Sequence, residues 1–229
     1  MEEQGIERTL AACERALAAG GKVDLTALGF WKAVAAVKTR PELVPTLGER
    51  IARIDREAFI RSAPLVFPAL WGVTAELVGT AVGVAILVAA PSLPSPWRGL
   101  AYLAAAGALI GATHGLAHYL VGGAMGMRFT HWYSLPPSKP QPGFKIDYAT
   151  YLRSPARSRA WMHASGAIAS KVVPFAVAAL AFAARAESWA IAVLVALGVL
   201  TLVTDLTFSV RSSDWKKFRR EMKVAAATR

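Results

Sequence analysis

Four long apolar runs constrain this chain more than any other feature of its sequence. They cover residues 64–90, 99–127, 161–184 and 188–210, and each contains few ionisable side chains. A helix needs roughly 20 apolar residues to cross the ~30 Å hydrocarbon core of a bilayer. Each run is long enough, whereas the helices of soluble domains are usually shorter. The runs therefore predict an all-α, polytopic membrane protein with four transmembrane helices.

The Lys and Arg residues are distributed unevenly around these runs. Ten lie in residues 1–63, six in residues 128–160 and seven in residues 211–229, whereas loops 91–98 and 185–187 hold one each. Because cytoplasmic flanks are the basic ones, we expect a multi-pass protein of a prokaryotic plasma membrane with both termini in the cytoplasm. The net charge of +11 then belongs to cytoplasmic segments. Anionic lipid headgroups are the expected partners, together with transmembrane segments of other proteins, and nucleic acid is not.

Three regions follow from this pattern: a helical cytoplasmic or interfacial region at 1–63, the transmembrane domain at 64–210, and a basic cytoplasmic tail at 211–229. In the first region Asp24 is placed to cap a second helix, and residues 47–61 predict a third. The first helix is indicated by four apolar side chains at helical spacing, namely Ile6, Leu10, Cys13 and Leu17.

The loop between the second and third runs differs in composition from the rest of the chain. Residues 127–133 are rich in β-branched and aromatic side chains, which predicts a short strand or β-hairpin after the second run. The prolines that follow predict an end to regular structure. They are Pro136, Pro137, Pro140 and Pro142.

Five ionisable side chains interrupt the apolar runs at comparable depth. Counted from the cytoplasmic end of each run, they lie roughly 8 to 20 Å into the bilayer. Each costs on the order of 3 kcal/mol on insertion scales, so their shared depth predicts one polar cluster. The five residues are Glu76, His114, His118, Lys171 and Asp205.

His114 and His118 are four residues apart, which places both imidazoles on one face of a helix. Two neutral imidazoles and the carboxylate of Asp205 suit Zn²⁺ and leave a fourth position open. These three residues form the predicted metal site. His131 is expected at the level of the headgroups, and His163 opens the third run within reach of the cluster. The sequence leaves open whether Glu76 and Lys171 form an ion pair between helices or take part in chemistry.

The residues around this site resemble the site-2 protease family of intramembrane zinc metalloproteases. The stretch His114-Gly115-Leu116-Ala117-His118 is similar to the HExxH helix of that family, and residues 126–130 are similar to the turn into its membrane-dipping strand. Residues 165–170 resemble the small-residue motif of the following helix, and Thr204-Asp205-Leu206 stands where the family carries its third ligand. The resemblance covers residues 99–210 and implies a metalloprotease-like fold with His114, His118 and Asp205 as zinc ligands.

The chain departs from the family pattern at three places. Gly115 stands where the family has the glutamate that activates zinc-bound water, and Ser170 stands at an asparagine position. The glycine and prolines that normally flank the aspartate are absent. The ligands are therefore expected to be kept and the general base lost, which predicts a zinc-binding pseudoprotease without proteolytic activity.

Two other hypotheses stay open at this point. In one, the protein is an active intramembrane metallohydrolase whose base is another carboxylate, with Glu76 as the first candidate. In the other, no metal is bound, and the polar cluster is structural or conducts protons or ions. Metal content separates the last hypothesis from the other two.

Overall fold

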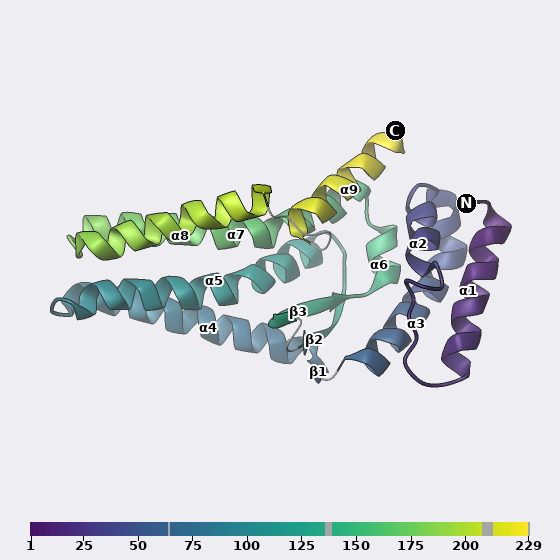
Figure 1. Ribbon diagram of the computed structural model, residues 1–229, viewed down its shortest axis with the longest axis horizontal. Coiled ribbons are helices and arrows are strands. Elements are labelled where there is room, and N and C mark those ends of the chain that lie inside the picture. The colour runs from purple at the N-terminus through teal and green to yellow at the C-terminus, as the bar shows by residue number, and fades with distance from the viewer. Residues whose placement is uncertain (64, 136–138, 208–212, 229) are drawn as a thin grey trace. The chain divides into compact units, whose positions relative to one another are not determined.

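The computed structural model of the chain describes residues 1–63, 65–135, 139–207 and 213–228. Helices dominate, and a small antiparallel sheet accompanies them (Figure 1). The chain forms two compact units. The first unit holds residues 1–69, 122–159 and 220–229, and the second unit holds residues 70–121 and 160–219.

The first unit begins with three helices, α1 (Glu3–Ala18), α2 (Phe30–Lys38) and α3 (Val44–Ser62). The four apolar residues predicted to share a face of α1 are all buried in the core, as expected. The chain turns after α1 at Gly20 and Gly21, both of which have positive φ. Helix α3 extends the predicted third segment by a few residues at its start, with Pro45 in its first turn.

The predicted cap of the second helix is wrong. The Asp24 side chain does accept hydrogen bonds from backbone N–H groups, those of Thr26 at 2.8 Å and Ala27 at 3.1 Å. It closes a turn instead of a helix, because α2 begins only at Phe30, after Gly29 with φ 79°. A left-handed residue of this kind interrupts helical geometry, and glycine adopts it without a steric penalty.

The sheet of the first unit consists of β1 (Leu65–Pro68), β2 (Phe129–Leu135) and β3 (Lys139–Ile146), in that order. The hairpin expected after the second run is thus present. Two details were predicted wrongly. Residues 65–68 belong to a strand rather than to the first span, and β3 contains Pro140 and Pro142. Proline is tolerated there because β3 is an edge strand, where half of the N–H groups point away from the partner.

The buried charges of the first unit are paired. The Glu221 carboxylate contacts Lys38 Nζ at 2.5 Å and Arg159 Nε at 2.7 Å, and it accepts a hydrogen bond from the Tyr151 hydroxyl at 3.0 Å. Burial alone raises the pKa of Glu221, but Lys38 and Arg159 outweigh it and hold the net pKa below its ordinary value. Glu221 lies on α9 (Asp214–Ala227), so the predicted basic tail contains a helix anchored by a buried acid.

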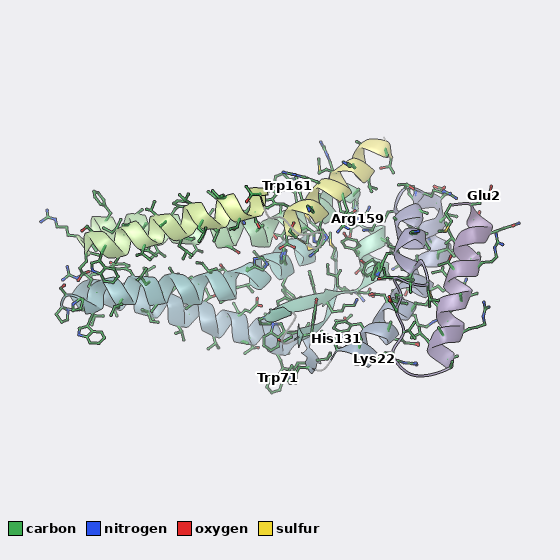
Figure 2. The ribbon with its side chains drawn as sticks, in the orientation of Figure 1. Glu2, Lys22, Trp71, His131, Arg159 and Trp161 are labelled. Atoms are coloured by element: carbon green, nitrogen blue, oxygen red, sulfur yellow. The ribbon has the colours of Figure 1, made fainter. Side chains whose placement is uncertain are left out.

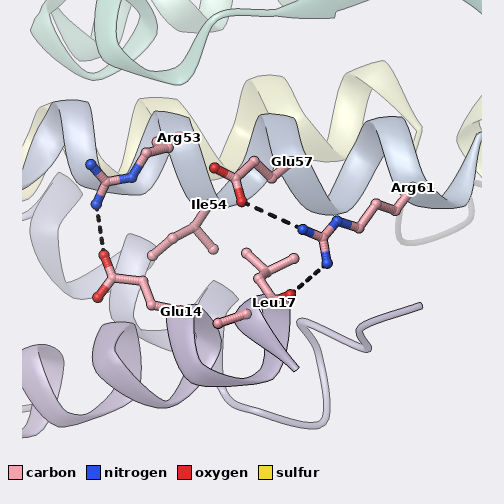
Figure 3. Close-up of a pocket in the computed structure, with 7 residues that line it drawn as sticks. Glu14, Leu17, Arg53, Ile54, Glu57 and Arg61 are labelled. Carbon is pink, nitrogen blue, oxygen red and sulfur yellow. Dashed lines mark hydrogen bonds and ion pairs between the residues drawn. The ribbon is translucent and has the colours of Figure 1, made fainter. Parts of the chain in front are cut away.

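A shallow pocket between α1 and α3 is rimmed by further ion pairs (Figure 3). Arg53 contacts Glu14 at 2.8 Å, and Arg61 donates to the Leu17 carbonyl at 2.5 Å. These side chains are partly exposed, so they stabilise the helix packing less than the buried pairs do.

The second unit contains four helices that are long and apolar enough to cross a membrane. They are α4 (Ala69–Ala89), α5 (Trp97–Ala124), α7 (Ala156–Ala183) and α8 (Ser188–Thr207); α6 (Tyr148–Arg153) belongs to the first unit. Their bounds agree with the four predicted runs to within about five residues. The last predicted residues of the fourth run, 208–210, lie outside the described residues.

The helices of the second unit pack through small residues and present large apolar ones outward. Ala105, Ala106 and Ala181 are fully buried, whereas Trp71 is 69% exposed and Trp161 is 51% exposed. Figure 2 labels both tryptophans; the Trp161 ring also packs against Phe218 of α9, with ring centroids 5.5 Å apart. Close packing over small side chains is typical of helices that associate in lipid.

Candidate metal centre

Helix α5 carries the two histidines of the candidate site. Residues four apart lie on one face of an α-helix, and the His114 and His118 rings are accordingly neighbours, with centroids 4.8 Å apart and planes nearly perpendicular. Both side chains are partly buried within the second unit. The local sequence therefore positions two imidazoles as it predicts.

Asp214, the first residue of α9, completes a group of three. Its Oδ2 atom lies 3.4 Å from His114 Nε2 and 3.2 Å from His118 Nε2. The three candidate ligand atoms all lie within 4.8 Å of one another, so one metal ion could contact all three. The other carboxylate oxygen, Oδ1, accepts a hydrogen bond from Lys217 Nζ at 3.0 Å.

Hydrogen bonds on the far side of each ring fix the imidazole protons. His118 Nδ1 lies 2.6 Å from the Met162 carbonyl, which can only accept, so Nδ1 must carry a proton. His114 Nδ1 lies 2.7 Å from Ser170 Oγ. The Ser170 hydroxyl donates its own hydrogen to the Gly166 carbonyl at 2.8 Å, so it accepts from Nδ1. These tautomers, assigned from the network, leave both Nε2 atoms as acceptors when the rings are neutral.

Two imidazole lone pairs and a carboxylate oxygen therefore point at one another. Three acceptors at this separation repel unless a cation or extra protons lie among them. Metal-binding histidines usually donate their second N–H to a carbonyl or another oxygen, as His114 and His118 do here. The arrangement could hold a metal ion through two nitrogen ligands and one oxygen ligand.

The Asp214 carboxylate is held in its ionised form. Burial raises its pKa, but His114 and His118, when they carry a proton on Nε2 and donate it to the carboxylate, and the Lys217 ammonium outweigh burial and bring the net pKa well below the ordinary range. An ionised carboxylate is the form that binds a metal.

Gly166 lets the α7 backbone approach the site. A Cβ atom at this position would lie 2.7 Å from His118 Cδ2 and closer still to its Nε2 atom. Any larger residue would displace the imidazole. The small-residue stretch 165–170 thus has two roles in the structure, since Gly166 makes room for one ring and Ser170 orients the other.

The structure places the remaining predicted residues elsewhere. Asp205, on the last turn of α8, forms an ion pair with Lys171 of α7 and is not part of the histidine group. His163 is buried on α7, and Glu76 is buried on α4 against α5. His131 lies on β2 in the first unit, where its Nδ1 is 2.9 Å from Thr130 Oγ1.

Asp214 is the site residue that the sequence interpretation missed. It falls in the segment regarded as a basic tail, although Asp214 and Glu221 are the only two acidic residues in 211–229. Both acids contact oppositely charged or imidazole groups in the structure. Isolated carboxylates in a strongly basic segment were the signal that could have identified them.

Comparison with known protein families, with curated proteins and with solved structures finds no significant match to this chain.

Proposed function

We propose that this chain is an integral membrane protein that binds one Zn²⁺ ion through His114, His118 and Asp214. The observation that carries the proposal is the convergence of three acceptor atoms, two of which belong to imidazoles whose protons are fixed on their far sides. Zinc is the metal that suits two imidazoles, one carboxylate and an open fourth position. This ligand set keeps the predicted histidines and takes Asp214 in place of Asp205.

The resemblance to site-2 proteases supports the same proposal. A histidine helix is followed by strands and then by a helix with a small-residue motif, and in this chain Ser170 of that motif contacts His114. We propose a metalloprotease-like architecture on this basis. Zinc bound in such a site supplies an acidic water molecule to a reaction.

The membrane location rests on the four apolar helices and on the exposed large apolar side chains of the second unit. We propose four spans with both termini in the cytoplasm and with anionic lipid headgroups contacting the basic segments. In a Cys13→Ala background, a membrane-impermeant thiol reagent applied to intact cells should label Ser92→Cys but not Lys22→Cys. Labelling of Lys22→Cys would contradict the orientation.

Metal analysis of the purified full chain in detergent tests the zinc site. We expect one zinc per chain in the native protein, and loss of zinc in His114→Ala, His118→Ala and Asp214→Asn. The matched controls, His131→Ala and Asp205→Asn, should keep their zinc. Retention in Asp214→Asn together with loss in Asp205→Asn would restore the ligand set predicted from the sequence. Absence of zinc from the native chain, even after zinc is added, would favour a structural or ion-conducting cluster.

A further inference from the structure

A buried carboxylate occupies the space that a side chain at position 115 would need. A Cβ atom on Gly115 would lie 2.8 Å from Glu76 Oε2 and 2.9 Å from Glu76 Cδ, with Oε1 closer still. Glu76 projects from α4 and is only 7% exposed. At Gly107, Gly111 and Gly123 of the same helix, nothing lies within 4 Å of the equivalent point. The glycine is therefore needed where the glutamate packs.

Position 115 adjoins the metal-binding face of α5. It follows His114 directly and precedes His118 by three residues, and side chains three apart are neighbours on a helix surface, about 5–6 Å between Cβ atoms. The Glu76 carboxylate thus stands beside the histidine face. Lys171, the cation considered as its partner from the sequence, forms an ion pair with Asp205.

We infer that Glu76 is the general base of a hydrolytic reaction at this site, an inference that rests on the proposed zinc-binding function. The carboxylate comes from α4 instead of from α5, and Gly115 leaves the room for it. Glu76 can act as the base only because position 115 has no side chain. The sequence predicts an inactive protein from Gly115 alone, but that prediction does not hold when Glu76 supplies the carboxylate.

The reaction in this role is hydrolysis of a carboxamide. Glu76 accepts a proton from the attacking water, whose oxygen forms a bond to the carbonyl carbon. As the C–N bond breaks, Glu76 returns that proton to the amine nitrogen, so water and amide give one carboxylic acid and one amine. A base positioned in this way typically accelerates hydrolysis by about 10²–10⁴-fold.

Cobalt-loaded protein provides a test that does not depend on a natural substrate. Co²⁺ reports its ligands through its visible spectrum, and acetohydroxamic acid chelates such metals while carrying a hydrogen-bond donor for a neighbouring carboxylate. We expect Glu76→Gln to bind Co²⁺ as the native chain does but to bind acetohydroxamic acid about tenfold more weakly. Hydrolysis of 4-nitrophenyl acetate by the zinc-loaded protein should fall about a hundredfold in the same variant.

Glu187→Gln is the matched control. The Glu187 carboxylate also packs against a glycine of α5, at 3.0 Å from a Cβ on Gly99, but fifteen residues before His114. This variant should leave both measurements unchanged. If Glu76→Gln behaves as Glu187→Gln does, the inference is wrong while the metal site stands. If neither variant nor the native chain binds Co²⁺, it is the proposed function that fails.

Moving the carboxylate back to α5 gives a second test. In Glu76→Ala combined with Gly115→Glu, the space vacated by Glu76 accommodates the new side chain beside His114. We expect this double variant to recover acetohydroxamic acid affinity that Glu76→Ala alone loses. No recovery in a variant that still binds Co²⁺ would show that the carboxylate at this place does not face the reacting position.

Discussion

Asp214 and Glu221 lie seven residues apart on α9, yet the surroundings of their carboxylates differ in kind. Glu221 belongs to the first unit and is held by Lys38, Arg159 and the Tyr151 hydroxyl, all of which donate hydrogen bonds to it. Asp214 belongs to the second unit, and it faces two imidazole nitrogens that accept when neutral. The first carboxylate is satisfied by protein alone. The second has Lys217 on its Oδ1 atom, but its Oδ2 atom faces two acceptor nitrogens and calls for a cation or extra protons among them.

Replacing each carboxylate by its amide should reveal the largest difference between the two sites, measured as a loss in the free energy of unfolding. Glu221→Gln leaves Lys38 and Arg159 buried without their counter-charge, and breaking a buried ion pair costs about 3–5 kcal/mol. Asp214→Asn in metal-free protein should cost far less, because the amide can donate to an imidazole nitrogen. Chemical unfolding of the full chain in detergent, followed by circular dichroism, measures both. Equal losses would mean that the imidazoles already donate to Asp214.

Zinc should stabilise the native chain through the second unit alone. A ligand present at a hundred times its Kd stabilises the folded state by about 2.7 kcal/mol, provided that it does not bind the unfolded chain. We expect this increment in the native protein and in Glu221→Gln, and none in His118→Ala. Thermal unfolding with and without zinc is the measurement. An increment that survives in His118→Ala would place the bound zinc elsewhere.

Gly166→Ala tests the geometry of the candidate metal site, because it displaces the His118 imidazole and keeps all three candidate ligands. The added methyl group would overlap the His118 ring, so the imidazole must leave the position in which its Nε2 atom lies 3.2 Å from Asp214 Oδ2. Changes just outside the ligands of a metal site typically cost 10- to 100-fold in affinity, and we expect a loss of that order here. Gly111→Ala is the control because nothing lies within 4 Å of its Cβ position. Zinc competition titrations give both affinities.

The smallest expected effect concerns His131, the histidine of the first unit. Burial, followed by the nearby Arg56 and Lys145, lowers the pKa of His131 below its ordinary value of 6.5. The unfolded chain then binds more protons between the two pKa values, so the free energy of unfolding rises with pH through that window. His131→Gln should remove this part of the pH dependence. If the pH profile of unfolding between pH 5 and 7.5 is unchanged in the variant, His131 does not titrate as described.

The elements of this fold could be predicted where periodicity or length is decisive. The α1 face, the four apolar helices and the His114–His118 pair all follow from spacing within one segment. Strand β1 could not, because four apolar residues ahead of a long apolar helix look like part of it. The helical phase of α8 is hidden for a related reason. A helix that is apolar all round carries no stripe to show which way Asp205 faces, and in the structure it faces Lys171.

The parts of the candidate site that could not be predicted depend on contacts between distant segments of the chain. Asp214 meets histidines of α5 a hundred positions earlier, and Glu76 of α4 meets Gly115 of α5, and neither contact has a local sequence pattern. Counting only lysines and arginines identifies residues 211–229 as a basic flank and leaves its two acidic residues out of consideration. From the sequence, Ser170 is only a departure from an asparagine, and in the structure its hydroxyl accepts a hydrogen bond from His114 Nδ1.

The position of Asp214 in the chain also determines when, during synthesis, the three candidate ligands are all present. His114 and His118 lie in the second of the four apolar helices, whereas Asp214 follows the fourth. At a synthesis rate of about 5–20 residues per second, the histidines precede their third partner by roughly 5–20 s. An ion captured in that interval has two protein ligands and exchanges easily. Under the proposed function, firm retention of zinc would begin only when α9 has been made, so that retention would report a chain whose helices have all been made and packed.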